Sequence, residues 1–260
     1  MPNALLLSPH LDDVAFSCAG TMLRLMASGW DAHLCTVFTA TVPNPQGFAL
    51  RCQTDKGLAP DADYMALRRA EDEAFAAILG VRDVRHWPFA EAPHRGYESA
   101  PELFAGARAG DDIWRPIADA LRELTAELNP DAIFAPQGLG GHVDHGQVIR
   151  AVARVGLASR TLWYRDTPYA LRGPDARPSP LLPTGLEEQA VMLSEGDLVR
   201  KIIGAQAYGT QIGFQFGGPD ETARKLRAFH ALEAARAGLR GYAERLLGPP
   251  GLPTLALSAV

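Results

Sequence analysis

The sequence predicts an α/β fold in which a doubly wound, mostly parallel sheet carries helices on both faces. Over residues 1–166, short apolar runs alternate with segments whose apolar residues recur at helical spacing. This alternation is typical of strand–helix–strand units in a parallel sheet. Because crossovers between parallel strands are right-handed, the simplest Rossmann-like topology has the strand order 3-2-1-4-5.

Five short runs, bounded by polar or turn-forming residues, are the expected strands. They are Ala4–Ser8, Ala32–Thr39, Val84–Phe89, Ala132–Pro136 and Thr161–Arg165. The segments between them have helical periodicity, and glycine or Asn-Pro supplies the expected stops. These expected helices are Asp13–Gly29, Met65–Gly80, Ile113–Leu128 and His145–Leu157.

Two stretches, Ala40–Asp63 and Ala90–Asp111, are rich in loop-forming residues and are expected to be long loops. Loops of this length are uncommon in compact domains unless they are functional. Beyond Asp166 the alternation stops, and no linker marks a second domain. We expect one domain over 1–260, with a core at 1–166 and residues 167–260 packed on it. The second part is expected to hold an irregular segment (Thr167–Gly185), a short strand (Gln189–Leu193), helices over Glu195–Tyr208 and Glu221–Leu247, and an apolar tail, Pro249–Val260.

Composition excludes several classes of protein. Among 260 residues, 47% are hydrophobic and 21% are charged, which are ordinary globular values. A net charge of −5 argues against a nucleic-acid partner, which needs a basic surface. Three cysteines without a CxxC motif do not form a disulfide framework. The chain lacks a basic, apolar leader pattern and an apolar run of about 18 residues, so we expect a soluble cytoplasmic protein without a membrane partner.

Polar residues follow the first and fourth expected strands, which are neighbours in the predicted order. His10, Asp12 and Asp13 follow the first strand, and His142, Asp144 and His145 follow the fourth. Each segment alone also fits a helix N-cap or a hydrogen-bonded polar residue at a strand end. Their coincidence at the predicted crevice favours a metal site instead. Histidine and carboxylate ligands without thiolates suit a hydrolytic zinc site, and paired aspartates allow one to bind metal while the other takes a proton.

These residues resemble the signatures of a known family. Pro9-His10-Leu11-Asp12-Asp13 resembles the PHPDDE motif, and His142-Val143-Asp144-His145 the HPDH motif, of the PIG-L/LmbE-like zinc-dependent N-acetylglucosaminyl deacetylases. Weaker similarity extends over about 4–218, in Arg68-Arg69-Ala70-Glu71, in Asp166-Thr167-Pro168-Tyr169 and in the Lys…Tyr…Gln segment 201–211.

The resemblance implies one zinc ion per chain and hydrolysis of an N-acetyl group, commonly on a glucosamine derivative. By position, His10, Asp13 and His145 would bind the metal, and Asp12 would be the general base. His142 would stabilise the oxyanion or protonate the amine, and Asp144 would orient His142. Zinc chemistry agrees with these roles, because zinc lowers the pKa of bound water to ~7 and polarises a carbonyl.

The chain also departs from the family pattern. Leu11 and Val143 replace prolines, which removes no ligand. Val14 replaces the Glu of the first motif, so a carboxylate behind the ligands is expected to be missing. Gly140 stands where some relatives carry a Tyr, so any Tyr contribution has to come from elsewhere or be absent.

Four residues are candidate substrate contacts. Arg68 can bind sugar hydroxyls or a carboxylate, or it can lie on a solvated helix face paired with Asp72. Glu91 can bind hydroxyls or cap a loop, and Tyr169 and Gln211 are similar candidates. Whether the loops 40–63 and 90–111 act as lids is left open.

The sequence thus predicts a zinc-dependent hydrolase that removes the N-acetyl group from an N-acetylglucosamine-type compound through a metal-activated water. Two alternatives stay open. One is an amidase for a larger amide of a glucosamine-linked conjugate, and the other is a non-catalytic sugar-binding module on the same fold. The partner is a small-molecule N-acetyl amino sugar. Its aglycone and the oligomeric state, including a homo-oligomer, are left open.

Overall fold

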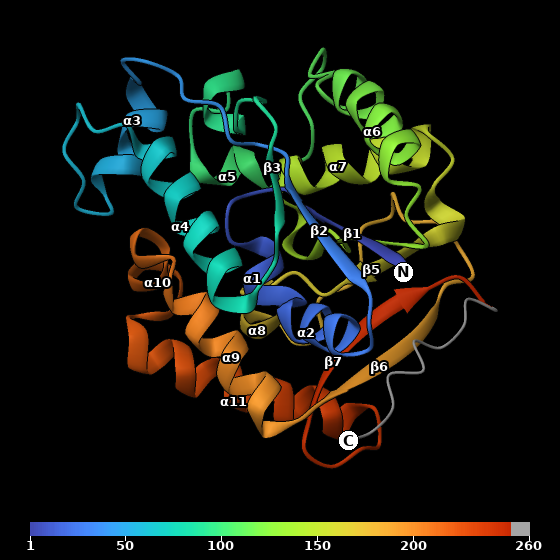
Figure 1. The fold of residues 1–260 in the computed structure, drawn as a ribbon. Coiled ribbons are helices and arrows are strands. Elements are labelled where there is room, and N and C mark those ends of the chain that lie inside the picture. The colour runs from blue at the N-terminus through green and yellow to red at the C-terminus, as the bar shows by residue number, and fades with distance from the viewer. Residues whose placement is uncertain (251–260) are drawn as a thin grey trace.

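A seven-stranded sheet forms the centre of the protein in a computed structural model that describes residues 1–250 (Figure 1). Its strand order is β3-β2-β1-β4-β5-β7-β6. The first five positions are parallel and confirm the predicted order, and β7 and β6 extend the sheet with antiparallel pairing. The strands are β1 (Asn3–Ser8), β2 (Asp31–Thr36), β3 (Asp83–His86), β4 (Ala132–Pro136), β5 (Thr161–Tyr164), β6 (Glu187–Leu193) and β7 (Tyr242–Gly248).

Helices cover both faces of this sheet. They are α1 (Asp13–Ser17), α2 (Ala19–Ala27), α3 (Gly47–Thr54), α4 (Tyr64–Leu79), α5 (Ala100–Leu103), α6 (Trp114–Leu128), α7 (Val143–Arg154), α8 (Tyr169–Arg172), α9 (Glu195–Gln206), α10 (Gly209–Phe216) and α11 (Pro219–Arg236). Three short 3₁₀ helices are η1 (Ala92–Arg95), η2 (Leu139–Gly141) and η3 (Ala158–Arg160). None of the helices within 1–250 is both long and apolar enough to cross a bilayer.

The alternation of side chains along β1 divides the core into two layers. Leu6 packs with residues of α1, α2, α4 and α9, whereas Leu5 and Leu7 pack with α6 and α7 on the other face. Figure 1 shows these two groups of helices on opposite sides of the strands. All three leucines are at most 1% exposed. Burial on both faces explains why β1 is a continuous apolar run rather than an alternating one.

The expected helix over Glu221–Leu247 is wrong in its second half. The helix α11 ends at Arg236, and residues 242–248 form β7, which pairs with both β5 and β6. Gly238 and Gly241 have φ angles of 73° and 95°, a left-handed conformation that breaks the helix. Pairing with two strands then favours the extended form of this segment.

Smaller differences concern the segments around the expected elements. The expected single helix after Asp13 is divided at Cys18, which has a φ of −130°, into α1 and α2. The two expected loops contain short helices, α3 in the first and η1 and α5 in the second. The unexpected helix α10 follows α9, and the short helix α8 lies within the segment expected to be irregular. Residues 251–260 of the expected apolar tail lie outside the described residues.

Candidate active site

The turn after β1 brings three candidate residues to the edge of the sheet. The Ser8 hydroxyl donates to the carbonyl of His10 (2.6 Å) and accepts from the Val14 amide (3.1 Å), which closes the turn. Asp12 occupies the N-cap position of α1, but its side chain makes no cap hydrogen bond. Asp13 begins α1, and its Oδ2 accepts from the His10 amide at 2.8 Å. Helix capping therefore does not account for Asp12.

The second set of candidates opens α7, directly beyond β4. His142 is the N-cap residue, and its Nδ1 accepts from the Asp144 amide at 3.2 Å. Asp144 and His145 lie in the first turn and are fully buried. Because β1 and β4 are parallel neighbours, the two sets meet at the same edge, as the sequence predicts.

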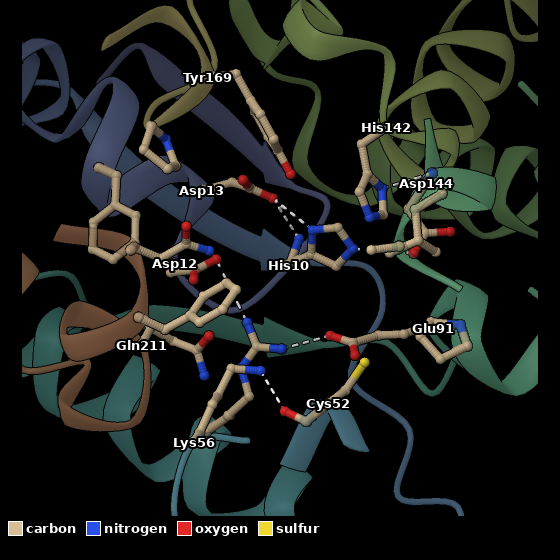
Figure 2. Close-up of a pocket in the computed structure, with 18 of the residues that line it drawn as sticks. His10, Asp12, Asp13, Cys52, Lys56, Glu91, His142, Asp144, Tyr169 and Gln211 are labelled. Carbon is tan, nitrogen blue, oxygen red and sulfur yellow. Dashed lines mark hydrogen bonds and ion pairs between the residues drawn. The ribbon is translucent and has the colours of Figure 1, made fainter. Parts of the chain in front are cut away.

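Asp13 lies between two histidines. Its Oδ2 is 3.2 Å from Nδ1 of His10 and 3.3 Å from Nε2 of His145. Ligand atoms of His10, His142 and His145 all lie within 4.8 Å of one another. Figure 2 shows His10 between Asp13 and Asp144, with the His142 ring beside it. The structure thus brings together all the residues that the two motifs contribute.

His145 indicates that this cluster can hold a cation. Its Nδ1 lies 2.5 Å from Oδ1 of the buried Asp166, a contact that keeps a proton on Nδ1, so that in the neutral ring the lone pair is on Nε2. That buried Nε2 has no hydrogen bond within the described residues and faces a carboxylate oxygen of Asp13. A cation has to lie between these two atoms. In the metal-free protein a proton fills this place, as the raised pKa of His145 indicates, and zinc would replace that proton, because imidazole plus carboxylate is a donor set that suits zinc.

His142 is better suited to donate a hydrogen bond than to bind metal. Burial lowers the pKa of its imidazole to about 3, so the ring is neutral near pH 7. Its Nδ1 accepts the amide hydrogen of Asp144, and a neutral ring with Nδ1 as acceptor carries its proton on Nε2. Both nitrogens are thereby unavailable as ligands. This argument favours Asp13 over His142 as the third ligand, and the ligand set predicted from the sequence stays a prediction.

The charges of the neighbouring groups separate the two aspartates. Burial raises the pKa of Asp12 to about 7, although the positive charge of Arg68 opposes it. Burial also acts on Asp13, but His145 and His10 outweigh it and hold the pKa of Asp13 well below its usual range. Conversely, Asp13 and Asp166 raise the pKa of His145 to about 9 against the effect of burial. Asp13 is therefore the permanent anion of the pair, and Asp12 is the one that can exchange a proton near neutrality.

The carboxylate of Asp144 makes contacts other than the expected one. It does not contact the His142 ring. Its Oδ2 lies 3.1 Å from Nε2 of His10 and accepts from the Ala92 amide at 3.0 Å, while Oδ1 lies 2.7 Å from the Arg95 guanidinium. The physical reason is the helical turn, which points the backbone amide of Asp144 at His142 and its side chain toward His10. Asp144 therefore orients His10, and only its amide holds His142.

Two residues make contacts in this site that were not predicted from the sequence. Arg95, on η1, reaches Asp144, and Asp166, just beyond β5, binds His145. Asp166 belongs to a segment that resembles the family, and this similarity was the only indication in the sequence that Asp166 contributes to the site. Asp144 and Asp166 also supply carboxylates behind the histidines, so the replacement of the motif Glu by Val14 does not leave the cluster without them.

Tyr169 fills the space that Gly140 leaves open. A Cβ atom at Gly140 would lie 2.8 Å from Cδ1 of Tyr169, and Gly140 has a φ of 80°. The Tyr169 ring lies edge-on to His145, with 5.7 Å between the ring centroids, and Figure 2 shows its side chain pointing into the pocket. A Tyr from another segment therefore lies beside the position at which some relatives carry theirs.

Arg68 is buried, not on a solvated helix face. Its guanidinium donates to Glu91 (2.6 Å) and lies 3.5 Å from Oδ1 of Asp12. Asp72, the alternative partner, instead accepts hydrogen bonds from Thr36 and Tyr208 and lies 2.8 Å from Nε2 of His86. The solvated-face interpretation is therefore wrong, because the N-terminal part of α4, with Arg68 on its second turn, faces the site.

Gln211 lies against the same region, where its Nε2 donates to the Tyr64 hydroxyl at 2.8 Å. The four candidate substrate contacts and the reacting groups line one cavity of about 450 Å³. Apolar side chains from several elements complete its wall. The roles predicted for the individual residues stay predictions, but each of them except the fully enclosed His145 lies on this cavity.

The family model described as PIG-L, GlcNAc-PI de-N-acetylase, matches residues 5–155. The match includes both motifs and the segment that carries Arg68 and Glu91. It ends just after α7, so it includes most of β1 and all of β2, β3 and β4 but not the fifth parallel strand, β5.

Individual relatives agree with this match. A 2'-N-acetylparomamine deacetylase of Streptomyces fradiae is 35% identical over 218 residues, which are 80% of this chain and 73% of that protein. Among solved structures, the deacetylase–bog complex from the biosynthesis pathway of teicoplanin superposes on this chain with a TM-score of 0.81. The sequence identity is 25%, and the superposition covers 94% of this chain and 96% of that one. The zinc-inhibited form of a teicoplanin deacetylase has a TM-score of 0.78 at 24% identity, over 94% and 97%.

Proposed function

The chain belongs to the PIG-L family of GlcNAc-PI de-N-acetylases, and on this premise we propose that it is a zinc-dependent hydrolase that removes the N-acetyl group from an amino-sugar compound. Its relatives are named deacetylases, so the chain is an amide hydrolase. The relative that is 35% identical acts on 2'-N-acetylparomamine, which supports an N-acetyl amino sugar as the substrate class.

The main support for this proposal is the position of Asp13 between two histidines, next to Asp12. Oδ2 of Asp13 lies 3.2–3.3 Å from nitrogens of both His10 and His145, and the neighbouring Asp12 lines the same cavity with a pKa near neutrality. His10, Asp13 and His145 would hold the zinc ion. When bound there, zinc would supply a Lewis acid that acidifies water and polarises an amide carbonyl.

The residues of the chain supply the proton transfers. Asp12 accepts a proton from the water that attacks the carbonyl carbon. His142 donates a hydrogen bond from Nε2 to the carbonyl oxygen as negative charge develops on it, which is the role of an oxyanion donor. The C–N bond then breaks, Asp12 returns its proton to the amine nitrogen, and acetate and the free amino sugar leave.

The side chains around Asp12 would orient the substrate. Arg68, Glu91, Gln211 and Tyr169 offer charged and neutral hydrogen-bonding atoms on the same cavity, as a sugar with several hydroxyls requires. The Arg68–Glu91 pair is buried and directional, so it can fix the ring relative to Asp12. Correct placement matters, because small displacements of reacting atoms cost large factors in rate.

The two alternatives differ from this proposal in one measurable product. A non-catalytic sugar-binding module would release nothing, and an amidase for a larger conjugate would release an acid other than acetate. The test is acetate release by the purified protein from N-acetylglucosamine, N-acetylglucosaminyl glycosides and 2'-N-acetylparomamine. We expect acetate and free amine in equal amounts from at least one of them. Absence of acetate from the whole panel, with correctly folded zinc-loaded protein, would contradict the proposal.

A further inference from the structure

The mouth of the cavity is apolar, unlike its interior. Four side chains form what we call the apolar rim: Phe48 of α3, Leu103 at the end of α5, Phe104 directly after it, and Phe214 of α10. Phe104 is 43% exposed and Phe214 is 65% exposed, whereas Asp12 and Asp13 at the reacting end are 6% and 5% exposed. Large rings left exposed around a cavity usually mark a surface that binds a ligand.

Aromatic side chains connect the apolar rim with His142 at the reacting end of the cavity. The ring of Phe104 lies edge-on to His142, with 5.4 Å between the centroids, and 5.8 Å from the ring of Tyr169. A substituent on the sugar that leaves the reacting end would therefore run along aromatic surface rather than into water.

Two cations that line the cavity, Lys56 beside Phe214 and Arg172 beside Gln215, have no carboxylate partner within residues 1–250. The Lys56 ammonium lies 5.5 Å from the Phe214 ring centroid and 5.0 Å from that of Tyr64, and it donates to the carbonyl of Cys52. Arg172 donates to the backbone and side-chain oxygens of Gln215, at 3.2 and 2.7 Å. Figure 2 shows Lys56 at the end of the pocket away from His142 and Asp144.

This charge distribution disfavours a cationic substituent. Asp55 is the carboxylate that lines the cavity near Lys56, whereas the other lining carboxylates, Asp12, Asp13, Glu91 and Asp144, belong to the reacting end and its hydrogen bonds. An amine that reaches the Phe214 ring would meet the half-buried Lys56 ammonium, which already lies over that ring, and the exposed Arg172 further along the cavity wall, so like charges oppose its binding.

We infer that the mouth of the cavity is a subsite for an uncharged aromatic aglycone attached to the amino sugar. The inference rests on the proposed deacetylase function and narrows its substrate class. The apolar rim buries the aglycone, and Lys56 and Arg172 disfavour, without excluding, substrates in which the same position carries an amine. Specificity then comes from attraction by Phe214 and its neighbours and from repulsion by the two cations.

The test compares three β-glycosides of N-acetylglucosamine that differ only in the aglycone: methyl, phenethyl and aminoethyl. Burial of a phenyl ring on the rim is expected to raise kcat/KM for acetate release roughly ten- to a hundredfold over the methyl glycoside. The aminoethyl glycoside is expected to fall below the methyl glycoside. Phe214→Ala should bring the phenethyl-to-methyl ratio close to one, and because the side chain is 65% exposed the variant should fold. Lys56→Glu should raise the aminoethyl-to-methyl ratio.

Ile203→Ala is the matched control, because Ile203 is a 47% exposed apolar residue on α9 that does not line the cavity. Its two ratios should equal those of the wild-type protein. Equal kcat/KM for the three glycosides, or a preference for the aminoethyl compound, would overturn the inference while leaving the deacetylase function intact. Failure to release acetate from any glycoside would instead count against the proposed function itself.

Discussion

The Arg95 guanidinium lies 2.7 Å from Oδ1 of Asp144, whose other carboxylate oxygen lies 3.1 Å from Nε2 of His10. Arg95 is itself held by Asp111, at 3.2 and 3.0 Å, and it donates to the carbonyl of Ala90 at 2.7 Å. The segment 90–111 is therefore tied to a predicted metal ligand through two charged contacts. The same segment carries Leu103 and Phe104 of the cavity wall.

Replacement of Arg95 should therefore lower the zinc affinity, although Arg95 does not itself contact a predicted metal ligand. Arg95→Gln removes the charge that holds Asp144, so His10 loses a fixed orientation. Residues behind metal ligands typically change metal affinity or activity roughly 10–100-fold, and we expect zinc affinity and kcat/KM to fall by such a factor. Zinc affinity is measured by chelator competition on the metal-free protein. The control is Arg122→Gln, whose exposed partner is Asp119. Wild-type zinc affinity in Arg95→Gln would exclude this positioning role.

Asp12→Asn should separate proton transfer from metal binding. The substitution keeps shape and hydrogen bonding but cannot accept a proton, and loss of a general base typically costs roughly 10²–10⁴-fold in rate. Zinc content should remain at the wild-type value, because Asp13 is the expected ligand. Asp61→Asn, at an exposed position outside this cavity, should change neither quantity. Loss of zinc from Asp12→Asn would mean that the two aspartates have exchanged roles.

Gly140→Ala should disturb the site through Tyr169. The new Cβ would lie 2.8 Å from the Tyr169 ring, so the ring has to move, and KM should rise. Gly156 is a matched control, because its φ of 74° resembles the 80° of Gly140 but nothing lies within 4 Å of an added Cβ. Both Ala variants should lose roughly 1 kcal/mol or more of unfolding free energy from the backbone strain. Steady-state kinetics should then show a raised KM in Gly140→Ala alone; equal KM values in the two variants would contradict the contact argument.

The buried pair of Lys201 and Glu244 should make the fold sensitive to acid. The two charges lie 2.6 Å apart, and Glu244 also accepts from the amides of Gly20 and Thr21 at the start of α2. Burial would raise the pKa of Glu244, but the charge of Lys201, the nearby His230 and hydrogen bonds from the side chains of Lys201 and Thr21 outweigh it and lower the pKa below 4.5. The pair therefore contributes stability that is complete above about pH 4.5 and is lost as the pH falls through the lower folded-state pKa.

Glu244→Gln tests this contribution by urea unfolding. At pH 7 the variant leaves Lys201 buried without its partner and should lose about 3–5 kcal/mol of unfolding free energy. The difference from the wild-type protein should shrink at pH values below the folded-state pKa of Glu244. Glu187→Gln, at an exposed position on β6, serves as the control. A difference at pH 7 that is no larger than that of the control would contradict the argument.

Much of the fold was predictable because its signals are local. The runs that form β1 and β4 are apolar and bounded by polar residues, and their adjacency follows from the handedness of crossovers, so the meeting of His10, Asp13 and His145 could be anticipated. The strand β7 could not, since its extended form depends on pairing with β5 and β6 rather than on its own periodicity.

The contacts that Arg95 and Arg68 make in the site were less predictable, because they too depend on residues far away in the sequence. Arg95 and Asp144 are 49 residues apart, and no spacing rule connects a loop arginine with the first turn of α7. Arg68 resembles an exposed helical residue in its own segment, and its burial arises only because the N-terminal part of α4 packs against Asp12 and Glu91. Side-chain partners across distant loops are set by tertiary packing, which a single sequence does not encode as a local pattern.

Acetate release by metal-stripped protein, followed as zinc is added back, tests whether this hydrolase depends on zinc. Activity on the best N-acetylglucosaminyl substrate should be absent without metal and rise linearly to a maximum at one zinc per chain. His145→Ala should bind little zinc and stay inactive throughout the titration, because it removes the buried Nε2 that faces Asp13. Full activity in the metal-free protein would contradict the zinc dependence of the reaction. Undiminished zinc binding by His145→Ala would contradict the assignment of His145 as a ligand.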